Sequence, residues 1–397
     1  MSTSSLLFRL AAITSLLFFG CEAEAPFAEG TFGHDLDILN AVEDIQVLQS
    51  GQSLVAVSGA LQGRVFTSSA DGLEGPSFGW FKRTAFKDGS FKKHYSGLGG
   101  EDRMWFGPQF GKYSVFFPPG AKDTDEEMRM APDLDTLNFT VTKQTDQEIV
   151  SSGQLRIGNF QGYTFTLAAE RKVSILDRPT IEGQLDITLS DKIKQVGFAT
   201  QTTIENAGNA AWEKETGLLS IWILGCMVPS DSALAIIPFK GDMDTVTNYF
   251  TPLDGSRVKI KDSTVYYRAD ANYLNKIGIL PEHTLPVFGS YSPELNLLTI
   301  VQFSFTNDSL YVNSQRVKQD DPYRGDVINV FNDGVTPTAG PFGPFYELET
   351  SSAAKPLLPG ESMYHLSRTY HFTGPEAALE KIAQAVLNVS LRDRARF

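Results

Sequence analysis

Alternating apolar and polar positions are the main pattern of the chain after about residue 50. One such run comprises Val196, Phe198, Thr200, Thr202 and Ile204, and a second comprises Tyr364, Leu366, Arg368, Tyr370 and Phe372. A period of two predicts a β-strand, because successive side chains of a strand point to opposite faces. Segments rich in β-branched and aromatic residues predict further strands at Leu54–Val57, Ser114–Phe117, Leu137–Thr142, Tyr163–Ala168, Leu185–Leu189, Ala233–Phe239, Leu297–Phe305 and Val327–Phe331.

Helices are predicted in only two places. A short helix covers about His34–Val42, and a clearer one follows Thr373 near the C-terminus. There, Thr373 is the expected N-cap, Pro375 lies in the first turn, and Glu376 is the acidic residue three positions on. Apolar residues of this second helix recur at helical spacing at Leu379, Ile382, Ala383, Val386 and Leu387. We expect this helix to pack on the outside of a sheet.

The order of these elements predicts the fold class. Many strands at short spacing without intervening helices indicate an all-β fold, a sandwich or a barrel, here with a C-terminal helix. The chain has 397 residues, and no internal repeat, low-complexity tract or linker divides its main part. Because all-β folds often run long as one domain, we expect a single domain over residues 31–397.

The N-terminus has the pattern of an export signal. A single charge, Arg9, precedes the apolar run Leu10–Phe19, which ends at Gly20 and Cys21. This run is too short to cross a bilayer, since a spanning helix needs about 20 apolar residues. Its end, Leu17–Cys21, resembles the lipobox of bacterial lipoproteins, in which the cysteine is acylated.

The lipobox resemblance implies a location. Residues 1–20 are expected to be a lipoprotein signal peptide, and residues 21–30 a short tether. Several acyl chains on Cys21 would hold the domain at a membrane. We expect a protein of the bacterial cell envelope, anchored at the outer membrane and facing the periplasm or the surface. The alternative is ordinary signal cleavage nearby, which leaves Cys21 a free thiol.

The charge balance narrows the classes of partner. The formal net charge is -13 and the isoelectric point is about 4.9, so no basic stripe is available to neutralise phosphates. Nucleic-acid binding is therefore not expected. The second cysteine, Cys226, lies in the apolar segment Leu218–Val228 and has no disulfide partner if Cys21 is acylated. We expect Cys226 to be a small buried residue.

Common catalytic and metal-binding motifs are absent or misplaced. Gly75–Gly79 fits G-x-S-x-G, but it lies in a Gly- and acid-rich segment and not between a strand and a helix, so it predicts a turn. There is no H-E-x-x-H, C-x-x-C, P-loop or dinucleotide motif, and the five histidines are scattered. Asp123, Asp125 and Glu127 could hold Ca²⁺, but a solvated charge run is far commoner. No metal or cofactor is expected.

The segment Tyr95–Phe117 could carry chemistry. It places Glu101, Asp102, Arg103 and Trp105 close to paired glycines. Carboxylates and an arginine can hydrogen-bond sugar hydroxyls in pairs, and a tryptophan offers a flat apolar face to a sugar ring. The alternative is a Gly-rich turn with an internal ion pair and a tryptophan in the core.

A second candidate segment is Gly343–Ser351. In a strand, Glu347 and Glu349 would share one face with their carboxylates roughly 7 Å apart. Paired carboxylates on a rigid strand suit general acid–base catalysis. The alternative is an edge strand with a solvated acidic face. Elsewhere, Trp212 and Trp222 are predicted to lie in the core, and His365 and His371 at the surface.

In their order along the chain, these segments resemble the galactose-mutarotase-like superfamily, particularly its bacterial lipoprotein branch. Gly99–Gly111 is similar to its G-G…P-x-F-G stretch, and Ile204–Gly208 to its turn before the central strand. Tyr346–Thr350, followed by Leu358–Ser362, is similar to its closing strands. The resemblance covers about residues 50–373 and implies a β-supersandwich whose broad antiparallel sheet forms a cleft for a sugar ring.

The resemblance also implies roles for residues. Leu348–Thr350 is similar to the L-E-T of aldose 1-epimerases, whose glutamate, here Glu349, takes the anomeric hydroxyl proton. The histidines that these enzymes use as acid have no counterparts at the expected positions. Asp102 or Glu101 could substitute if an apolar site raised its pKa. Related sequences often have Glu where this chain has Gln109.

Three functions follow as hypotheses. The first is carbohydrate binding in a cleft formed by Glu349, Asp102, Arg103 and Trp105, with Glu101, Gln109 and Glu347 nearby. The second is an aldose or sugar epimerase with Glu349 as general base and Asp102 as acid. The third is a non-catalytic interaction protein of the cell envelope, in which Glu101, Asp102, Arg103 and Glu349 do not converge on one concave surface.

Overall fold

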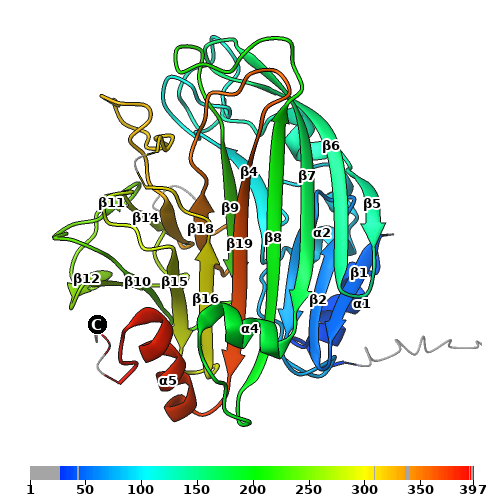
Figure 1. The fold of residues 1–397 in the computed structure, drawn as a ribbon, viewed down its shortest axis with the longest axis vertical. Coiled ribbons are helices and arrows are strands. Elements are labelled where there is room, and N and C mark those ends of the chain that lie inside the picture. Colours follow the sequence, from blue (N-terminus) through cyan, green and yellow to red (C-terminus); the bar gives the residue numbers. More distant parts are fainter. Residues whose placement is uncertain (1–26, 43, 308, 336–339, 393, 395–396) are drawn as a thin grey trace, which may run out of the picture.

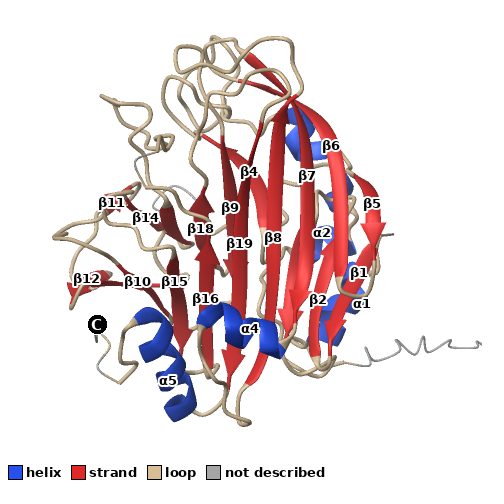
Figure 2. Ribbon diagram, in the orientation of Figure 1, coloured by secondary structure: helices blue, strands red, loops and turns tan. Residues whose placement is uncertain are grey.

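The computed structural model describes residues 27–397 apart from residues 43, 308, 336–339, 393 and 395–396. The predicted signal peptide and Cys21 lie outside the described residues. The described chain forms three antiparallel sheets with helices at their outer faces (Figures 1 and 2). The all-β class with a C-terminal helix is therefore confirmed.

The largest sheet has ten strands. In spatial order these are β12 (Val258–Lys261), β13 (Thr264–Arg268), β10 (Leu234–Pro238), β15 (Val287–Ser292), β16 (Leu297–Phe303), β19 (Ser362–Thr373), β8 (Lys194–Asn206), β7 (Thr164–Leu176), β6 (Glu148–Gly158) and β5 (Thr140–Gln144). The two alternating runs of the sequence form β8 and β19, which pair along 12 positions at the centre of this sheet. Both predictions are confirmed.

Two smaller sheets pack against one face of the ten-stranded sheet. The six-stranded sheet has the order β11 (Thr247–Asn248), β14 (Asn275–Ile279), β17 (Ile328–Asn332), β18 (Tyr346–Ser351), β9 (Ser220–Met227) and β4 (Arg103–Gly107). The three-stranded sheet contains β1 (Ile45–Ser50), β2 (Ser53–Ser58) and β3 (Arg64–Ser69). Apolar residues from both small sheets form the core with the ten-stranded sheet.

Helices cover the outer faces. The structure has α1 (Phe32–Leu39), α2 (Arg83–Lys87), α3 (Pro132–Thr136), α4 (Arg178–Leu185) and α5 (Glu376–Leu387), with a 3₁₀ turn at Ser90–Lys92. The C-terminal helix α5 and helix α4 pack on the outside of the ten-stranded sheet, as predicted for α5 (Figure 2). The N-cap position of α5 is Pro375 and not Thr373, because Thr373 still pairs with Leu297 in the sheet.

Three strand predictions need correction. Ser114–Phe117 is a loop, in which the Ser114 hydroxyl accepts the backbone N–H of Phe116. Leu185–Leu189 starts as the last residue of α4 and continues as a loop, because Asp186 adopts a left-handed conformation that ends the helix. In Leu137–Thr142, the strand starts only at Thr140.

Polar groups are buried between the sheets. Arg171 of β7 forms an ion pair with Asp102, and the other Asp102 oxygen accepts a hydrogen bond from Thr200 of β8 at 2.9 Å. His371 of β19 lies 2.7 Å from Glu101. The prediction that His365 and His371 are surface residues is wrong, because their face of the central strand β19 points into this interior.

Candidate functional site

Strand β18 divides its side chains between two environments. Tyr346 and Thr350 point toward the ten-stranded sheet, where they meet Ser290 at 2.8 Å and His365 at 2.9 Å. Because side chains alternate along a strand, Glu347 points to the opposite face, as does Glu349. The strand lies between β17 and β9, so the alternative of an edge strand with a solvated acidic face is wrong.

Register brings other functional groups onto this face. Glu349 stands opposite Leu224 of β9 and Asn329 of β17. Residues two positions apart share a face, which places Trp222 beside Glu349. Trp105 of β4 stands opposite Trp222 in turn. We call this the outer face of the six-stranded sheet, and it also carries Arg103, Glu347, Lys276 and Ser351.

Glu349 is held by two cationic or polar donors. Its Oε2 accepts a hydrogen bond from the Trp222 Nε1 at 2.7 Å and one from the Lys276 Nζ at 2.7 Å. The Lys276 ammonium also lies 4.4 Å from the centre of a Trp222 ring and 5.2 Å from that of Tyr249. Glu349, Trp222 and Lys276 are buried, and Tyr249 is partly buried. The Glu349 Oε1 has no hydrogen-bond partner in the described part of the chain.

Burial changes the acidity of Glu349. Removal from water raises its pKa to about 7, with the charge of Glu347 adding to the rise and Lys276 opposing it. A carboxyl group with this pKa exists in both protonation states near neutral pH. It can therefore accept or donate a proton there, which is what a general base or acid requires.

A second carboxyl group lies close by. Asp326 accepts hydrogen bonds from the Tyr249 hydroxyl at 2.6 Å and from the Thr247 hydroxyl at 2.8 Å. Burial raises the pKa of Asp326 to about 6, while the two hydrogen bonds and the charge of Lys276 oppose the rise. The structure thus has two carboxyl groups of raised pKa whose acidity Lys276 affects, Glu349 by direct contact and Asp326 through its charge.

A small cavity lies against Asp326, Lys276 and Trp222, and Glu349 binds two of these residues without lining the cavity itself. Its volume is about 10 Å³, room for about one water-sized molecule. Its walls combine an indole, an ammonium, a carboxyl, hydroxyls and amides, and they comprise Gly107, Ser220, Trp222, Tyr249, Lys276, Val312, Ser314, Asp326, Asn329 and Ser351. The Ser220 hydroxyl is buried and has no hydrogen-bond partner among the described residues. We call this space the inner cavity.

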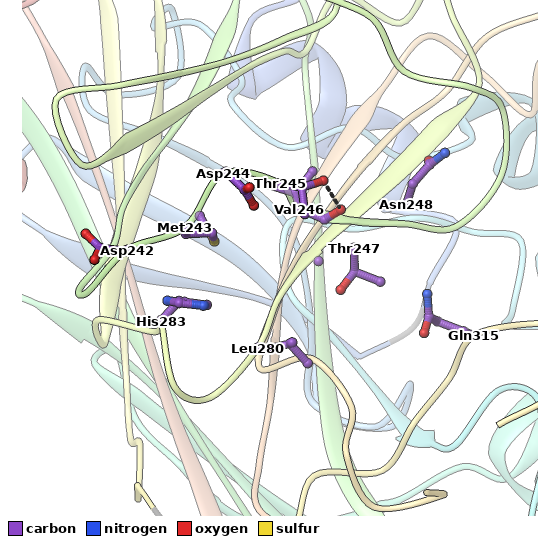
Figure 3. A pocket seen from close by; sticks show the side chains of 11 residues that line it. Asp242, Met243, Asp244, Thr245, Val246, Thr247, Asn248, Leu280, His283 and Gln315 are labelled. Carbon is purple, nitrogen blue, oxygen red and sulfur yellow. Dashed lines mark hydrogen bonds between the residues drawn. The ribbon is translucent and has the colours of Figure 1, made fainter. Parts of the chain in front are cut away.

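A larger, open pocket lies beside β11 (Figure 3). Its volume is about 420 Å³, within the range of about 300–1,000 Å³ for small-molecule sites. Thr247 lines this pocket and donates to Asp326, which lines the inner cavity. Ser314 lines the inner cavity and its neighbour Gln315 lines the open pocket. We call this space the outer pocket.

Arg103 and Glu347 form an adjacent ion pair on the outer face. The Arg103 Nη2 lies 2.5 Å from the Glu347 Oε1, and its guanidinium lies 4.4 Å from the centre of a Trp105 ring. The Cys226 thiol donates to the same Glu347 oxygen at 3.1 Å. Burial and the charge of Glu347 raise the pKa of the Cys226 thiol well above its usual value. Cys226 is therefore a buried thiol, as expected, and not a thiolate nucleophile.

The structure separates the two other predicted carboxylates from Glu349. Asp102 faces the ten-stranded sheet, where Arg171 and Thr200 bind both of its oxygens. Burial raises the pKa of Asp102, while Arg171 and Thr200 oppose the rise. Glu101 meets His371 and Ser68 in the same interior. Neither carboxylate is brought to the outer face.

Gln109 lies near the inner cavity through its backbone. Its N–H donates to the Ser314 hydroxyl at 3.0 Å, and its side-chain amide lies 4.0 Å from the Met128 sulfur. Of the residues predicted from the sequence, the outer face therefore unites Glu349, Glu347, Arg103 and Trp105. Gln109 stands at its margin.

Sequence reasoning missed three residues of the site, Lys276, Asp326 and Tyr249. The prediction that Trp222 lies in the core is confirmed, but its hydrogen bond to Glu349 is not evident from the sequence. The lysine before the apolar run Ile277–Leu280 is a signal that could have identified Lys276, because a buried lysine needs a partner. Nothing in the local sequence marks Asp326 or Tyr249, since their contact depends on how distant segments pack.

The described part of the chain contains neither a cluster of metal-ligating side chains nor a helix that could span a membrane. No set of three or more His, Cys, Asp or Glu side chains among the described residues is arranged to hold a metal ion. Asp123 and Asp125 contact Arg316. The helices of the described chain lack the length and apolar character needed to cross a membrane.

Comparison with protein families gives one match. Residues 30–396 match the family described as "Family of unknown function (DUF6786)". The chain belongs to this family. A comparison with curated proteins finds no match.

Several solved structures are similar to this DUF6786 protein. A putative aldose 1-epimerase from Escherichia coli K12 has 10% identity and a TM-score of 0.49, with 82% of this chain and 98% of that chain covered. A galactose mutarotase-like protein from Lactobacillus casei has 10% identity and a TM-score of 0.48, with 83% and 99% covered. At these values, the interpretation of the site rests on the chain's own residues.

Asp326 predicts a pH dependence of stability. Its folded-state pKa is raised from 3.8 to about 6, so the folded state holds its proton more tightly than the unfolded state. The associated stabilisation is fully present below about pH 4 and is lost as the pH rises to about 6. It amounts to about 3 kcal/mol for a shift of this size.

For this reason, we expect the free energies of unfolding of the wild type and of Asp326→Asn, measured in urea, to depend differently on pH. Between about pH 4 and pH 7, the free energy of unfolding of the wild type should fall by about 3 kcal/mol relative to that of the variant. The comparison removes the pH-independent cost of the altered hydrogen bonds. Parallel stability curves for the two proteins would show that Asp326 is not a buried carboxyl of raised pKa.

Proposed function

We propose that this protein binds carbohydrate on the outer face of the six-stranded sheet, around Glu349. The observation that carries the proposal is the cluster at the inner cavity, where Trp222 and Lys276 both bind Glu349. A sugar presents a flat apolar face and a rim of hydroxyls. The cluster offers an indole, an ammonium and two carboxyl groups, which match both parts of such a ligand.

The unpartnered acceptor and donor supply a second argument. The Glu349 Oε1 and the Ser220 hydroxyl are buried without hydrogen-bond partners in the described residues. A buried polar group without a partner costs free energy, which a ligand hydroxyl would recover by bonding to it. The acidic charge of the chain also supports a ligand other than nucleic acid.

Glu349→Gln tests the binding site, because it removes the charge and preserves the shape. We expect the substitution to weaken sugar binding by roughly fivefold, since hydrogen bonds to a charged acceptor exceed those to a neutral one by about 1 kcal/mol. Isothermal titration of the full-length protein in detergent against a panel of neutral and charged sugars measures the change. Circular dichroism melting checks that the variant is folded.

Glu170→Gln is the matched control, because Glu170 is an exposed carboxylate on β7 and lies outside the site. Its affinity for sugars should equal that of the wild type. If no sugar binds the wild type, the carbohydrate proposal fails and the envelope interaction protein becomes the better hypothesis.

An aldose or sugar epimerase is the second candidate, and the pKa of Glu349 favours it. A general base works best with a pKa near the working pH, and that of Glu349 is raised to about 7. Asp326, with a pKa raised to about 6, is the nearby carboxyl that could supply the acid in place of Asp102. The Lys276 ammonium, which donates a hydrogen bond to Glu349, is the other group that could supply a proton.

The epimerase hypothesis predicts accelerated interconversion of sugar anomers. Because Glu349 must be unprotonated as the base and Asp326 protonated as the acid, the rate should be highest between about pH 6 and pH 7 and should fall on either side. Glu349→Gln should lower the rate by roughly 10²–10⁴-fold, the usual contribution of a general base. NMR exchange spectroscopy on the signals of the α and β anomeric protons measures the rate of interconversion. Tight sugar binding with no acceleration over buffer would leave binding as the function and exclude this candidate.

We also propose that the protein is a lipoprotein of the bacterial cell envelope, attached through Cys21. The short apolar run before Gly20 and Cys21 supports this proposal. Expression in a Gram-negative host with an alkyne-labelled fatty acid should label the wild type, and Cys21→Ser should remove the label and release the protein from membranes. Cys226→Ser is the matched control and should keep the label. Equal labelling of the wild type and Cys21→Ser would contradict the proposal.

A further inference from the structure

We propose that the outer pocket binds one unit of the sugar ligand and selects positively charged amino sugars over neutral sugars and neutral sugars over sugar acids. This inference rests on the proposed carbohydrate-binding function and names the ligand class. The pocket lies beside β11 and is lined by Asp242, Met243, Asp244, Thr245, Val246, Thr247, Asn248, Gly278, Leu280, His283 and Gln315 (Figure 3).

The lining of the outer pocket matches the two sides of a sugar ring. Met243, Val246 and Leu280 supply apolar contact surface. Asn248 and Gln315 supply amides, each of which both donates and accepts hydrogen bonds. The volume of about 420 Å³ lies in the range of small-molecule pockets. A ligand with hydroxyls around an apolar ring fits such a mixture.

The charge of the pocket decides between classes of sugar. Asp242 and Asp244 are exposed at the pocket, and both also line an adjoining pocket whose wall includes Lys261. No lysine or arginine lines the pocket. His283 is the basic group there, and its Nδ1 lies 3.1 Å from the backbone oxygen of Lys240. A protein of net charge -13 adds to this negative field, which attracts an ammonium group and repels a carboxylate.

The outer pocket shares a wall with the inner cavity. Thr247 lines the outer pocket, and its hydroxyl donates to the Asp326 Oδ1 at 2.8 Å. Gly278 lines the pocket beside it, and a Cβ at that position would lie 2.2 Å from the Asp326 Oδ2. The absent side chain therefore allows Asp326 to reach the wall between the two spaces.

The inner cavity supplies an independent sign of a ligand. The Ser220 hydroxyl lines it, is almost fully buried and has no partner among the described residues. Ser314 and Gln315 are consecutive, yet they line the inner cavity and the outer pocket respectively. We infer that the sugar ring occupies the outer pocket and that one of its polar groups points through the shared wall toward Asp326 and Ser220.

The experiment is titration calorimetry of the full-length protein in detergent, at about pH 6.5, where a sugar amine is largely charged. The probes are glucosamine, glucose and glucuronate, with galactosamine, galactose and galacturonate as a second series. In at least one series, we expect the amino sugar to bind roughly fivefold or more tightly than the neutral sugar. We expect the acid to bind roughly tenfold or more weakly, and both differences to shrink at high salt.

The double variant Asp242→Asn/Asp244→Asn isolates the outer pocket. It should bring the affinities of the three sugars in a series within about twofold of one another, because the charges that rank them are gone. The matched control is Glu170→Gln/Asp191→Asn, which removes two exposed carboxylates away from the pocket and changes the net charge equally. The control should keep the wild-type ranking.

Each outcome separates the inference from the proposed function. If the Asp242→Asn/Asp244→Asn variant keeps the wild-type ranking of the three sugars, the inference that the outer pocket selects sugars by charge is overturned. A loss of affinity in Glu349→Gln would then still support sugar binding at the outer face. Equal affinity of the wild type for all three charge classes also overturns the inference alone. If none of the six sugars binds the wild type, both the inference and the proposed function fail.

Discussion

The alternation of side chains along β18 is the constraint on which the arrangement of the site depends. One face of this strand must close the core against the ten-stranded sheet, and Tyr346 and Thr350 do so through contacts with Ser290 and His365. The other face is then obliged to carry Glu347 and Glu349. Since β18 is central in its sheet, these carboxylates are buried and need partners from neighbouring strands. Lys276, Trp222 and Arg103 meet that need.

The molecule separates its buried charges into two groups with different surroundings. Between the sheets, Asp102 and Arg171 are enclosed by neighbouring strands and are bound by partners on both sides. On the outer face, the Glu349 Oε1 and the Ser220 hydroxyl are left without partners in the described chain. A fully bonded ion pair specifies how sheets pack, whereas an incompletely bonded cluster beside a cavity can exchange partners with a ligand. The cavity is what distinguishes the two groups, because the Glu101 Oε2 between the sheets also has no partner among the described residues.

Much of the fold and part of the site could be predicted from the sequence. Alternation identified β8 and β19, and it placed Glu347 and Glu349 on one face, because period and strand identity are local properties. The direction of Asp102 could not be predicted, since it follows Glu101 and precedes Arg103 in an irregular segment whose partners come from other sheets. Lys276 reaches Glu349 only because β14 pairs with β17 in one register, and a single sequence does not show register between distant strands.

The distribution of tryptophans gives the protein a natural optical probe. Trp222 bonds to Glu349, Trp105 packs edge-on against it with ring centres 5.5 Å apart, and Trp80 stacks on Phe345 next to the same sheet. Trp212 lies apart, in the core beside Phe165. Indole emission responds to charge and polarity around the ring. Ionisation of Glu349, or arrival of a molecule at the inner cavity, will therefore change the colour and intensity of the protein's own fluorescence without any attached dye.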